Sequence, residues 1–314
     1  MAFQIYSAKD IPLEAWSSLT GNSFFASPAF ASLWEVFGGR EVFLADEEQG
    51  ILKAGMAGIV FGRKYLRRFQ SMPEGLYGGI YWNDAVSEME KRQFIASFEN
   101  YLKKEKFIRA DIYNPPSPFH AAAFEERPES THILHLGTNS YKFPNRRMER
   151  YIRHAGREGD FRIVTLDDES YLEDFYHLVL ATSRRHNSKP RYSRRFFKRL
   201  LTIAKRDSRV IWPMVLSGET ITASHIYFRE RSQIFDWQSY SDRDDPLRPN
   251  YLLYDYIVNL AVSLNIKEIN LGGSPPGVDS LVEFKERWGG RKSTYPYYTY
   301  LSGLGKLIYR GKRV

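Results

Sequence analysis

Cysteine is absent from the 314 residues of this chain, which excludes disulfide bonds, cysteine-bound zinc and a thiol nucleophile together. No stretch of about 18 apolar residues occurs, so the sequence predicts no membrane-spanning helix. The first residues show no basic segment followed by an apolar one, and we therefore expect no signal peptide. His, Asp and Glu residues lack metal-ligand spacing, so no metal site is predicted. These absences favour a cytoplasmic protein, with peripheral contact to an anionic membrane left open.

The composition is that of a globular protein with a core, since 43% of the residues are hydrophobic and 26% are charged. The length suits one large or two medium domains. The net charge of +8 is unevenly placed: between Arg184 and Arg209 eleven residues are Arg or Lys, and only Asp207 is acidic. Further basic segments span 146–157 and 63–68. Such clusters attract polyanions such as nucleic acid or anionic lipid, or they are solvated helix faces.

Apolar periodicity predicts a regular order of elements in the second half. The expected helices and strands cover, in order, helices at about 148–155, 170–182 and 194–204, strands at 210–216, 221–228 and 233–240, a helix at 250–264, a strand at 267–271, a short helix at 281–288 and a strand at 293–300. The expected order is therefore helices, three antiparallel strands, helix, strand, short helix and strand.

The first half repeats this order. It shows strands at 41–45, 52–61 and 65–72, a helix at 87–104, a strand at 107–113, a Pro-Pro loop at 114–116, a short helix near 119–124 and a strand at 131–136. We therefore predict an α/β (α+β) chain of two tandem domains, 1–137 and 138–314. Each is expected to hold a mixed, mostly antiparallel sheet flanked by helices.

A glycine-rich loop followed by a lysine is the richest motif. The segment Leu271-Gly272-Gly273-Ser274 ends a predicted strand, and Phe284-Lys285 and Trp288-Gly289 follow on a short helix. Glycines permit close backbone approach, and a lysine beyond them can stabilise negative charge on a carbonyl or bind phosphate. The competing interpretation is a core-facing Phe284 and Trp288 pair, four residues apart, beside a solvated lysine.

This segment resembles the C-terminal signature of the Fem-type and related GNAT-like acyltransferases. The segments 24–38 and 72–79 resemble their N-terminal entry and first-domain glycine loop. Arg146-Arg147, followed by 152–155, resembles the helix that opens their second domain. Together these motifs span nearly the whole chain.

The resemblance implies a tandem GNAT fold that joins an activated acyl group to an amine. In the Fem-type branch the donor is an aminoacyl-tRNA and the acceptor is a peptidoglycan precursor, whereas relatives use acyl-CoA in polysaccharide and envelope pathways. The donor is then a co-substrate rather than a tightly bound cofactor. Phe284 and Lys285 match the family pair near the donor and the reaction centre, and the resemblance adds Gly272, Gly273, Ser274, Arg146 and Arg147 as donor- or substrate-binding candidates.

The sequence departs from ordinary acetyl-CoA enzymes at one loop. Those enzymes hold the pyrophosphate with a glycine-containing loop at a helix N-terminus. Here the segment 246–251 contains Arg248 and Tyr251 but no glycine. This difference counts against acetyl-CoA and favours a donor carried on tRNA or another unusual donor, and it makes Arg248 and Tyr251 donor-site candidates.

Removal of the amine proton requires a base, and the sequence leaves Asp236, His225 or a water open. A lone histidine or aspartate on a strand is more often a hydrogen-bonded core residue than a base. We therefore expect Lys285, with the backbone amides near Gly272 and Gly273, to stabilise the oxyanion. The alternatives are an acyl-CoA-dependent N-acyltransferase and a non-catalytic GNAT-like module that binds polyanions through its basic surface. The oligomeric state is not predicted.

Overall fold

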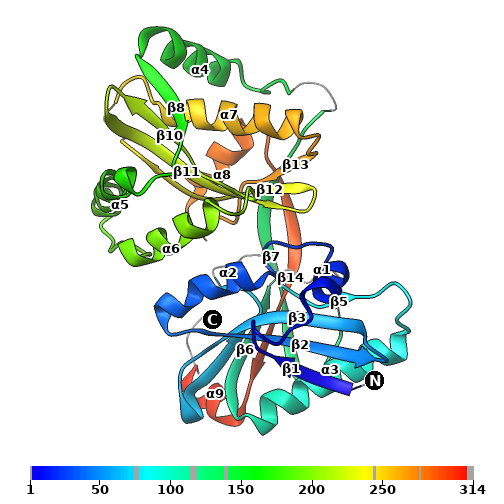
Figure 1. Cartoon of the computed structure of the whole chain (residues 1–314). Coiled ribbons are helices and arrows are strands. Elements are labelled where there is room, and N and C mark those ends of the chain that lie inside the picture. The colour runs from blue at the N-terminus through cyan, green and yellow to red at the C-terminus, as the bar shows by residue number, and fades with distance from the viewer. Residues whose placement is uncertain are drawn as a thin grey trace. The chain divides into compact units, whose positions relative to one another are not determined.

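The computed structural model of the chain describes residues 2–73, 78–113, 119–137, 141–242, 245–275 and 277–309. The chain divides into two compact units. Unit 1 contains Met1–Glu129 and Thr294–Val314, and unit 2 contains Ser130–Ser293. The chain enters unit 2 within strand β7 (Phe124–His135) and returns to unit 1 within strand β14 (Arg291–Leu301), as Figure 1 shows.

Unit 1 is a mixed sheet with helices on both faces (Figure 1). Its strands lie in the order β1 (Ala2–Tyr6), β2 (Arg40–Glu48), β3 (Ile51–Phe61), β4 (Arg67–Gln70), β6 (Phe107–Tyr113) and β14, with β5 (Tyr81–Trp82) also paired to β3. Its helices are α1 (Leu13–Thr20), α2 (Pro28–Ser32), α3 (Glu88–Lys104) and α9 (Gly303–Ile308), with 3-10 turns η1 (Leu33–Phe37) and η2 (Lys64–Leu66). β4 and β6 are parallel, whereas β6 and β14 are antiparallel.

Alternation along β2 supplies both faces of this sheet with core residues. Val42 and Leu44 belong to the core cluster that contains Phe94 and Phe98 of α3. Phe43 points the other way because successive strand residues alternate, and its ring meets that of Trp16 on α1 at 5.4 Å. Helix α3 begins with a capping box of Ser87 and Glu90.

Unit 2 repeats the plan. Its strands lie in the order β7, β13 (Glu268–Asn270), β12 (Gln233–Ser241), β11 (Thr220–Glu230), β10 (Pro213–Ser217) and β8 (Phe161–Thr165), with β9 (Val210–Ile211) also paired to β11. Its helices are α4 (Arg146–Glu158), α5 (Leu172–Arg185), α6 (Arg194–Ala204), α7 (Asn250–Ser263) and α8 (Asp279–Arg287), with a 3-10 turn η4 (Glu169–Tyr171). β12 and β13 are parallel, and β13 and β7 are antiparallel.

Two layers of helices cover this second sheet (Figure 1). Leu253 of α7 packs on Val215 and Ala223, whereas Phe175 of α5 packs edge-on against Trp212 at 4.9 Å. Helices α4 and α7 lie on one side of the sheet and α5 and α6 on the other. Unit 2 therefore buries both faces of its strands, as an α/β layered domain does.

The structure confirms the predicted fold class, because each unit is a mixed, largely antiparallel sheet flanked by helices. It differs from the predicted domains of 1–137 and 138–314 at two strands. Residues 133–135 of β7 pair with β13 in unit 2, and residues 297–301 of β14 pair with β6 in unit 1. Each half therefore supplies the last strand of the other unit's sheet.

Some predicted segments differ or cannot be compared. The predicted short helix near 119–124 is wrong, because that segment is a turn that leads directly into β7. Phe119 is buried there by stacking on Tyr298, with ring centroids 4.2 Å apart, so its apolar character reflects tertiary packing. The centre of the first glycine loop (74–77), the Pro-Pro loop (114–116) and residues 138–139 of the predicted boundary lie outside the described residues.

Gly58 of β3 has no room for a side chain. A Cβ atom there would lie 2.2 Å from the ring of Phe69, which is fully buried. Gly58→Ala should therefore lower the free energy of unfolding by about 1–3 kcal/mol through overpacking. Thermal and denaturant melts measure the change. Gly156→Ala is the control: its Cβ would meet nothing within 4 Å, and alanine in that helix should be neutral or stabilising.

Candidate active site

Lys285 lies in the last turn of α8 and is buried, with 6% of its surface exposed. Its Nζ donates hydrogen bonds to Gly272 O at 2.9 Å, Gly273 O at 2.6 Å and Ser274 Oγ at 3.1 Å. All three ammonium hydrogens therefore have an acceptor on the loop between β13 and α8. Burial lowers the pKa of Lys285 to about 8, while the charge of Asp236 opposes this shift. The lysine is not the solvated side chain of the competing interpretation.

The loop itself presents one occupied and one available amide. Gly272 adopts φ +72°, a left-handed conformation that favours glycine, and its N–H donates to Asn270 Oδ1 at 2.8 Å. The N–H of Gly273 has no acceptor in the described part of the chain. Ser274 accepts from Lys285, which leaves its own hydroxyl hydrogen for another acceptor. Gly273 and Ser274, rather than Gly272, are the donors that can face a ligand.

Asp236 on β12 lies beside this loop, since a Cβ on Gly272 would contact the Asp236 carbonyl oxygen at 3.6 Å. The residue as a whole is partly exposed, but its carboxyl group is enclosed by protein. Burial raises the pKa of Asp236 to about 7, although Lys285 and a hydrogen bond from Tyr254 oppose the rise. A carboxyl group with a pKa near 7 is suited to accept a proton at neutral pH.

His225 on β11 is a weaker candidate for the base. It is 1% exposed, and its Nδ1 lies 2.7 Å from the hydroxyl of Tyr227. Burial lowers the pKa of His225 to about 3, so the ring is neutral at physiological pH and has little affinity for a proton. Its ring meets that of Tyr254 edge-on at 4.8 Å, which makes it part of the wall behind Asp236.

A pocket of about 320 Å³ adjoins these residues at the N-terminus of α7. Its walls are formed by Asp242, Arg248, Asn250, Tyr251 and Phe284. Phe284 contacts Tyr251 and Tyr254 with ring centroids at 6.4 and 5.5 Å. The structure thus brings the predicted residues Phe284, Arg248 and Tyr251 together. Trp288 is buried against Tyr254 at 4.6 Å, so it anchors α8 while Phe284 lines the pocket.

The loop before α7 uses its amides internally. The N–H of Leu247 donates to Asp245 Oδ1, that of Arg248 to Asp245 O, and that of Tyr251 to Arg248 O. Pro249 has no amide hydrogen. Four of the amides that would face a pyrophosphate are therefore occupied or absent. This arrangement extends the sequence argument against a coenzyme A pyrophosphate cradle at this position.

Neither of the two arginines predicted at the start of α4 lines the pocket, but Arg147 shares a ring contact with Arg248, which does. Arg147 Nε donates to the hydroxyl of Tyr151 at 2.7 Å, and the Arg248 guanidinium lies 4.8 Å from the centre of the same ring. Arg146 is exposed and does not line the pocket. In the basic segment 184–209, three cations form ion pairs with carboxylates: Arg194 with Glu173, Lys198 with Glu169 and Arg209 with Asp207.

Sequence analysis missed two residues of this site. Tyr254 donates a hydrogen bond to Asp236, and its ring contacts those of His225 and Phe284. In the sequence it stands among the apolar residues of a helix, where nothing distinguishes it from a core tyrosine. His132 on β7 is 2% exposed, and neither ring nitrogen has a hydrogen-bond partner. Burial and the nearby charge of Lys285 lower its pKa. Its backbone pairs with Leu271 and Gly272, so it borders the loop.

Within the described residues, no group of three or more His, Asp or Glu side chains is arranged to hold a metal ion. No helix in the same residues is both long enough and apolar enough to cross a bilayer.

Comparison with known proteins identifies the fold. Residues 144–286 match the family of GNAT acetyltransferase domains. The structure of FemX aligns with a TM-score of 0.74 at 11% identity over 99% of both chains. The C-terminal domain of a putative lysylphosphatidylglycerol synthetase from Agrobacterium fabrum aligns with a TM-score of 0.61 at 13% identity, covering 94% of this chain and 93% of that one.

A tandem GNAT protein from the clavulanic acid biosynthesis pathway aligns with a TM-score of 0.55 at 10% identity, covering 96% of this chain and 98% of that one. No curated protein sequence matches the chain. The family match includes α7, the glycine loop and Lys285, so the candidate site belongs to an acyltransferase-type domain. The predicted resemblance is confirmed at the level of the fold: the chain has a tandem GNAT fold like that of FemX, and its residues 144–286 match the GNAT acetyltransferase domain family.

Proposed function

We propose that the chain is an N-acyltransferase that moves an aminoacyl or acyl group from an activated ester or thioester to an amine on an envelope precursor. The observation that carries this proposal is the buried pair of Asp236 and Lys285 beside the pocket lined by Phe284. Structures with the same fold include FemX and a lysylphosphatidylglycerol synthetase domain, which supports an aminoacyl group and an envelope acceptor.

The chemistry divides among the residues of the site. The amine nitrogen attacks the donor carbonyl carbon, a C–N bond forms, and the C–O or C–S bond to the carrier breaks. The Asp236 carboxylate takes the proton that the amine loses. The oxyanion receives hydrogen bonds from the Gly273 N–H and the Ser274 hydroxyl, and the Lys285 ammonium behind them stabilises its charge. The leaving oxygen or sulfur departs with that same proton, which Asp236 returns to it directly or through a water, so the carboxylate is restored.

The finer part of the proposal is an aminoacyl-tRNA donor, which places the reaction in the cytoplasm. Its support is the loop at 245–251, whose amides are bonded internally and do not offer a pyrophosphate cradle. An acyl-CoA donor would need such a cradle or a substitute for it. Arg147 and Arg248, which meet at the ring of Tyr151, offer cations for a phosphate of the tRNA terminus.

The direct test incubates the full chain with charged tRNA or with a panel of acyl-CoAs, each with amine-bearing peptidoglycan precursors, and measures donor turnover. We expect turnover of aminoacyl-tRNA that depends on the acceptor and is about a hundredfold or more slower in Lys285→Ala. Turnover of acyl-CoA alone would refute the tRNA donor while keeping the acyltransferase. Absence of turnover with every donor would favour a non-catalytic module.

Arg248→Ala should raise KM for the donor about tenfold or more and leave kcat nearly unchanged. The Arg248 guanidinium lines the pocket together with Phe284, whereas Asp236 is reached from Phe284 only through Tyr254. We therefore expect Arg248 to contribute to donor binding and not to contact the reacting atoms. Steady-state kinetics with varied donor measure the split. Arg157→Ala, an exposed arginine on the last turn of α4, is the matched control and should change neither constant.

A further inference from the structure

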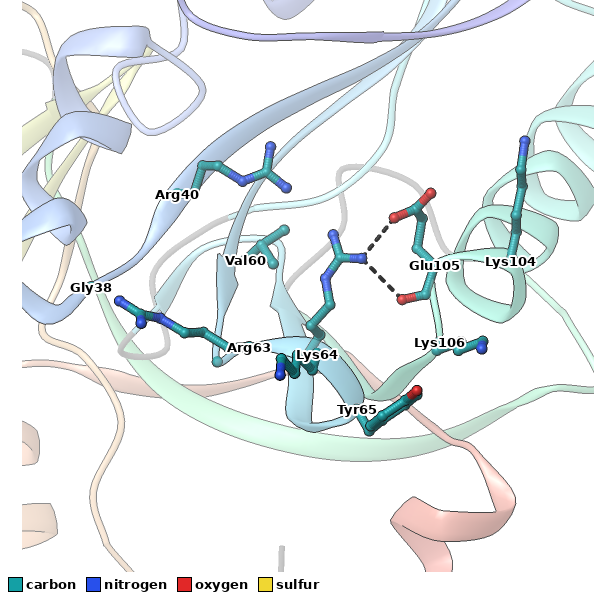
Figure 2. A pocket seen from close by; sticks show the side chains of 11 residues that line it. Gly38, Arg40, Val60, Arg63, Lys64, Tyr65, Lys104, Glu105 and Lys106 are labelled. Carbon is teal, nitrogen blue, oxygen red and sulfur yellow. Dashed lines mark hydrogen bonds and ion pairs between the residues drawn. The ribbon is translucent and has the colours of Figure 1, made fainter.

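Unit 1 contains a second hollow, of about 790 Å³, that includes none of the residues of the candidate active site. Figure 2 shows basic side chains around it. They come from four places: Arg40 begins β2, Arg63 and Lys64 form the turn between β3 and β4, Lys104 ends α3, and Lys106 precedes β6. The volume lies within the range of small-molecule sites.

Most of the charge in this hollow is uncompensated. Its one carboxylate, Glu105, is bound by Arg67 at 2.6 Å, and Arg67 also donates to the Glu105 carbonyl oxygen at 3.1 Å. The other five cations are exposed, and none has an ion-pair partner in the part of the chain that the structure describes. They are Arg40, Arg63, Lys64, Lys104 and Lys106. Like charges gathered in one hollow repel each other, so this grouping opposes folding unless an anion joins it.

Helix capping accounts for only one of these residues. Lys104 occupies the last turn of α3, where cations stabilise the negative end of the helix dipole. Arg40 and Arg63 belong to no helix, and Lys106 follows the end of α3. The convergence of these three with Lys64 therefore needs another explanation.

The turn between β3 and β4 and the turn between α3 and β6 each place a lysine in the left-handed region. Gly62 adopts φ +79°, and a Cβ there would lie 2.3 Å from Leu66 O, so the turn is tight. Lys64 and Lys106 adopt φ +50° and +57°, in the left-handed region where glycine or asparagine is usual. Each turn thus carries a lysine at a position where glycine or asparagine would be less strained.

Tyr65 adds an aromatic surface to the same turn. The residue is 62% exposed, and Lys106 Nζ lies 5.4 Å from the centre of its ring (Figure 2). An exposed ring held by a cation can pack against the apolar or cyclic part of a ligand whose charged part meets the lysines and arginines.

We propose that this hollow is an anion-binding site for a ligand that carries at least two phosphate groups. A phosphate brings up to two negative charges and three acceptor oxygens, whereas a carboxylate brings one charge. Two phosphates therefore match five cations better than any single carboxylate does. Arg40 and Arg63 supply planar donor forks that fit phosphate oxygens, and Lys64, Lys104 and Lys106 supply point charges. The ligand is either a soluble polyphosphate compound or the headgroup of a phospholipid that carries two phosphates at a bilayer surface.

The test uses the full chain, with inorganic tripolyphosphate as the soluble probe in calorimetric titrations at low salt. Co-sedimentation with vesicles of phosphatidylcholine, alone or mixed with cardiolipin, whose headgroup carries two phosphates, is the lipid arm. The pocket variant is Arg63→Ser with Lys64→Asn, because asparagine tolerates the left-handed position. The control is Lys9→Asn with Arg92→Ser, which removes the same charge from exposed positions of unit 1 outside the hollow.

We expect the pocket variant to bind about tenfold or more weakly and to melt at or above the wild-type temperature, and the control to bind and melt like the wild type. Tripolyphosphate binding without vesicle binding identifies a soluble ligand, and vesicle binding that tripolyphosphate displaces identifies a headgroup. Equal weakening in both variants would overturn the proposal, as would a wild-type chain that binds neither probe or binds only an RNA oligonucleotide. Donor turnover is not measured, so the result is independent of the proposed acyl transfer.

Discussion

Replacing Lys285 with alanine is expected to slow acyl transfer about a hundredfold or more, the usual effect of removing one preorganised donor from an oxyanion site. Lys285 fixes Gly273 and Ser274 through its Nζ and contributes the positive charge behind them. The variant therefore loses both the charge and the loop geometry. Single-turnover rates with the true donor measure the effect, because they separate the chemical step from product release.

The fold should survive this change with some loss of stability. Alanine leaves the carbonyl of Gly273 without its donor, whereas that of Gly272 keeps the His132 N–H, and one such loss costs about 1–3 kcal/mol. Lys285→Arg should recover only part of the activity, because a planar fork does not reproduce three bonds that diverge from one nitrogen. Melts matched to the kinetics exclude unfolding as the cause.

Ser274→Ala separates the two roles of the lysine. It removes the hydroxyl that Lys285 polarises but leaves the two carbonyl contacts. We expect an intermediate loss of rate with unchanged stability. Undiminished turnover in Lys285→Ala would instead show that the lysine stabilises only the loop and takes no part in catalysis.

The sequence predicted the elements that are buried on both faces and missed those at the edges. β10 and β11 are buried along most of their length, β12 carries β-branched and aromatic residues, and each was predicted within a few residues. β1 and β8 lie at sheet edges and pair with a single neighbour, and β8 leaves Ile163 exposed. A strand that buries little has a weak apolar pattern, so periodicity cannot reveal it.

The sequence could not predict that β7 pairs with a strand of unit 2 and β14 with a strand of unit 1. A strand's own pattern shows which of its faces is buried, but not which strand it joins. Tyr297 and Thr299 of β14 gather around Asp111 of β6, 186 and 188 residues away in sequence, and no local signal marks that pairing. The repeat of elements was therefore visible, whereas the allocation of the last strands was not.

The candidate site was predictable in its residue types but not in its geometry. Lys285 and Phe284 were identified from their motif, and the structure places Phe284 at the pocket and Lys285 under the loop. Tyr254 and His132 resemble ordinary core residues in sequence. Their relevance arises from burial beside Asp236 and Lys285, which depends on the packing of α7 and β7.

The pH dependence of the rate should be bell-shaped, with its maximum between about 7 and about 8. Burial raises the pKa of Asp236 to about 7, so the carboxylate that takes the amine proton forms as pH rises through that value. Burial lowers the pKa of Lys285 to about 8, so its charge is lost as pH rises further. The two limbs belong to the interacting pair rather than to either group alone.

Asp236→Asn should lower the rate at pH 7.5 by about a hundredfold to ten-thousandfold and abolish the rising limb, because an amide cannot accept the proton. Tyr254→Phe should move that limb to higher pH: the Tyr254 hydrogen bond holds the Asp236 pKa down, and its loss lets the pKa rise further. Asp255→Asn, on the same helix but outside the pocket, is the control and should leave the profile unchanged. A rising limb that persists in Asp236→Asn would assign the base to another group, and the candidates would then be water and His132.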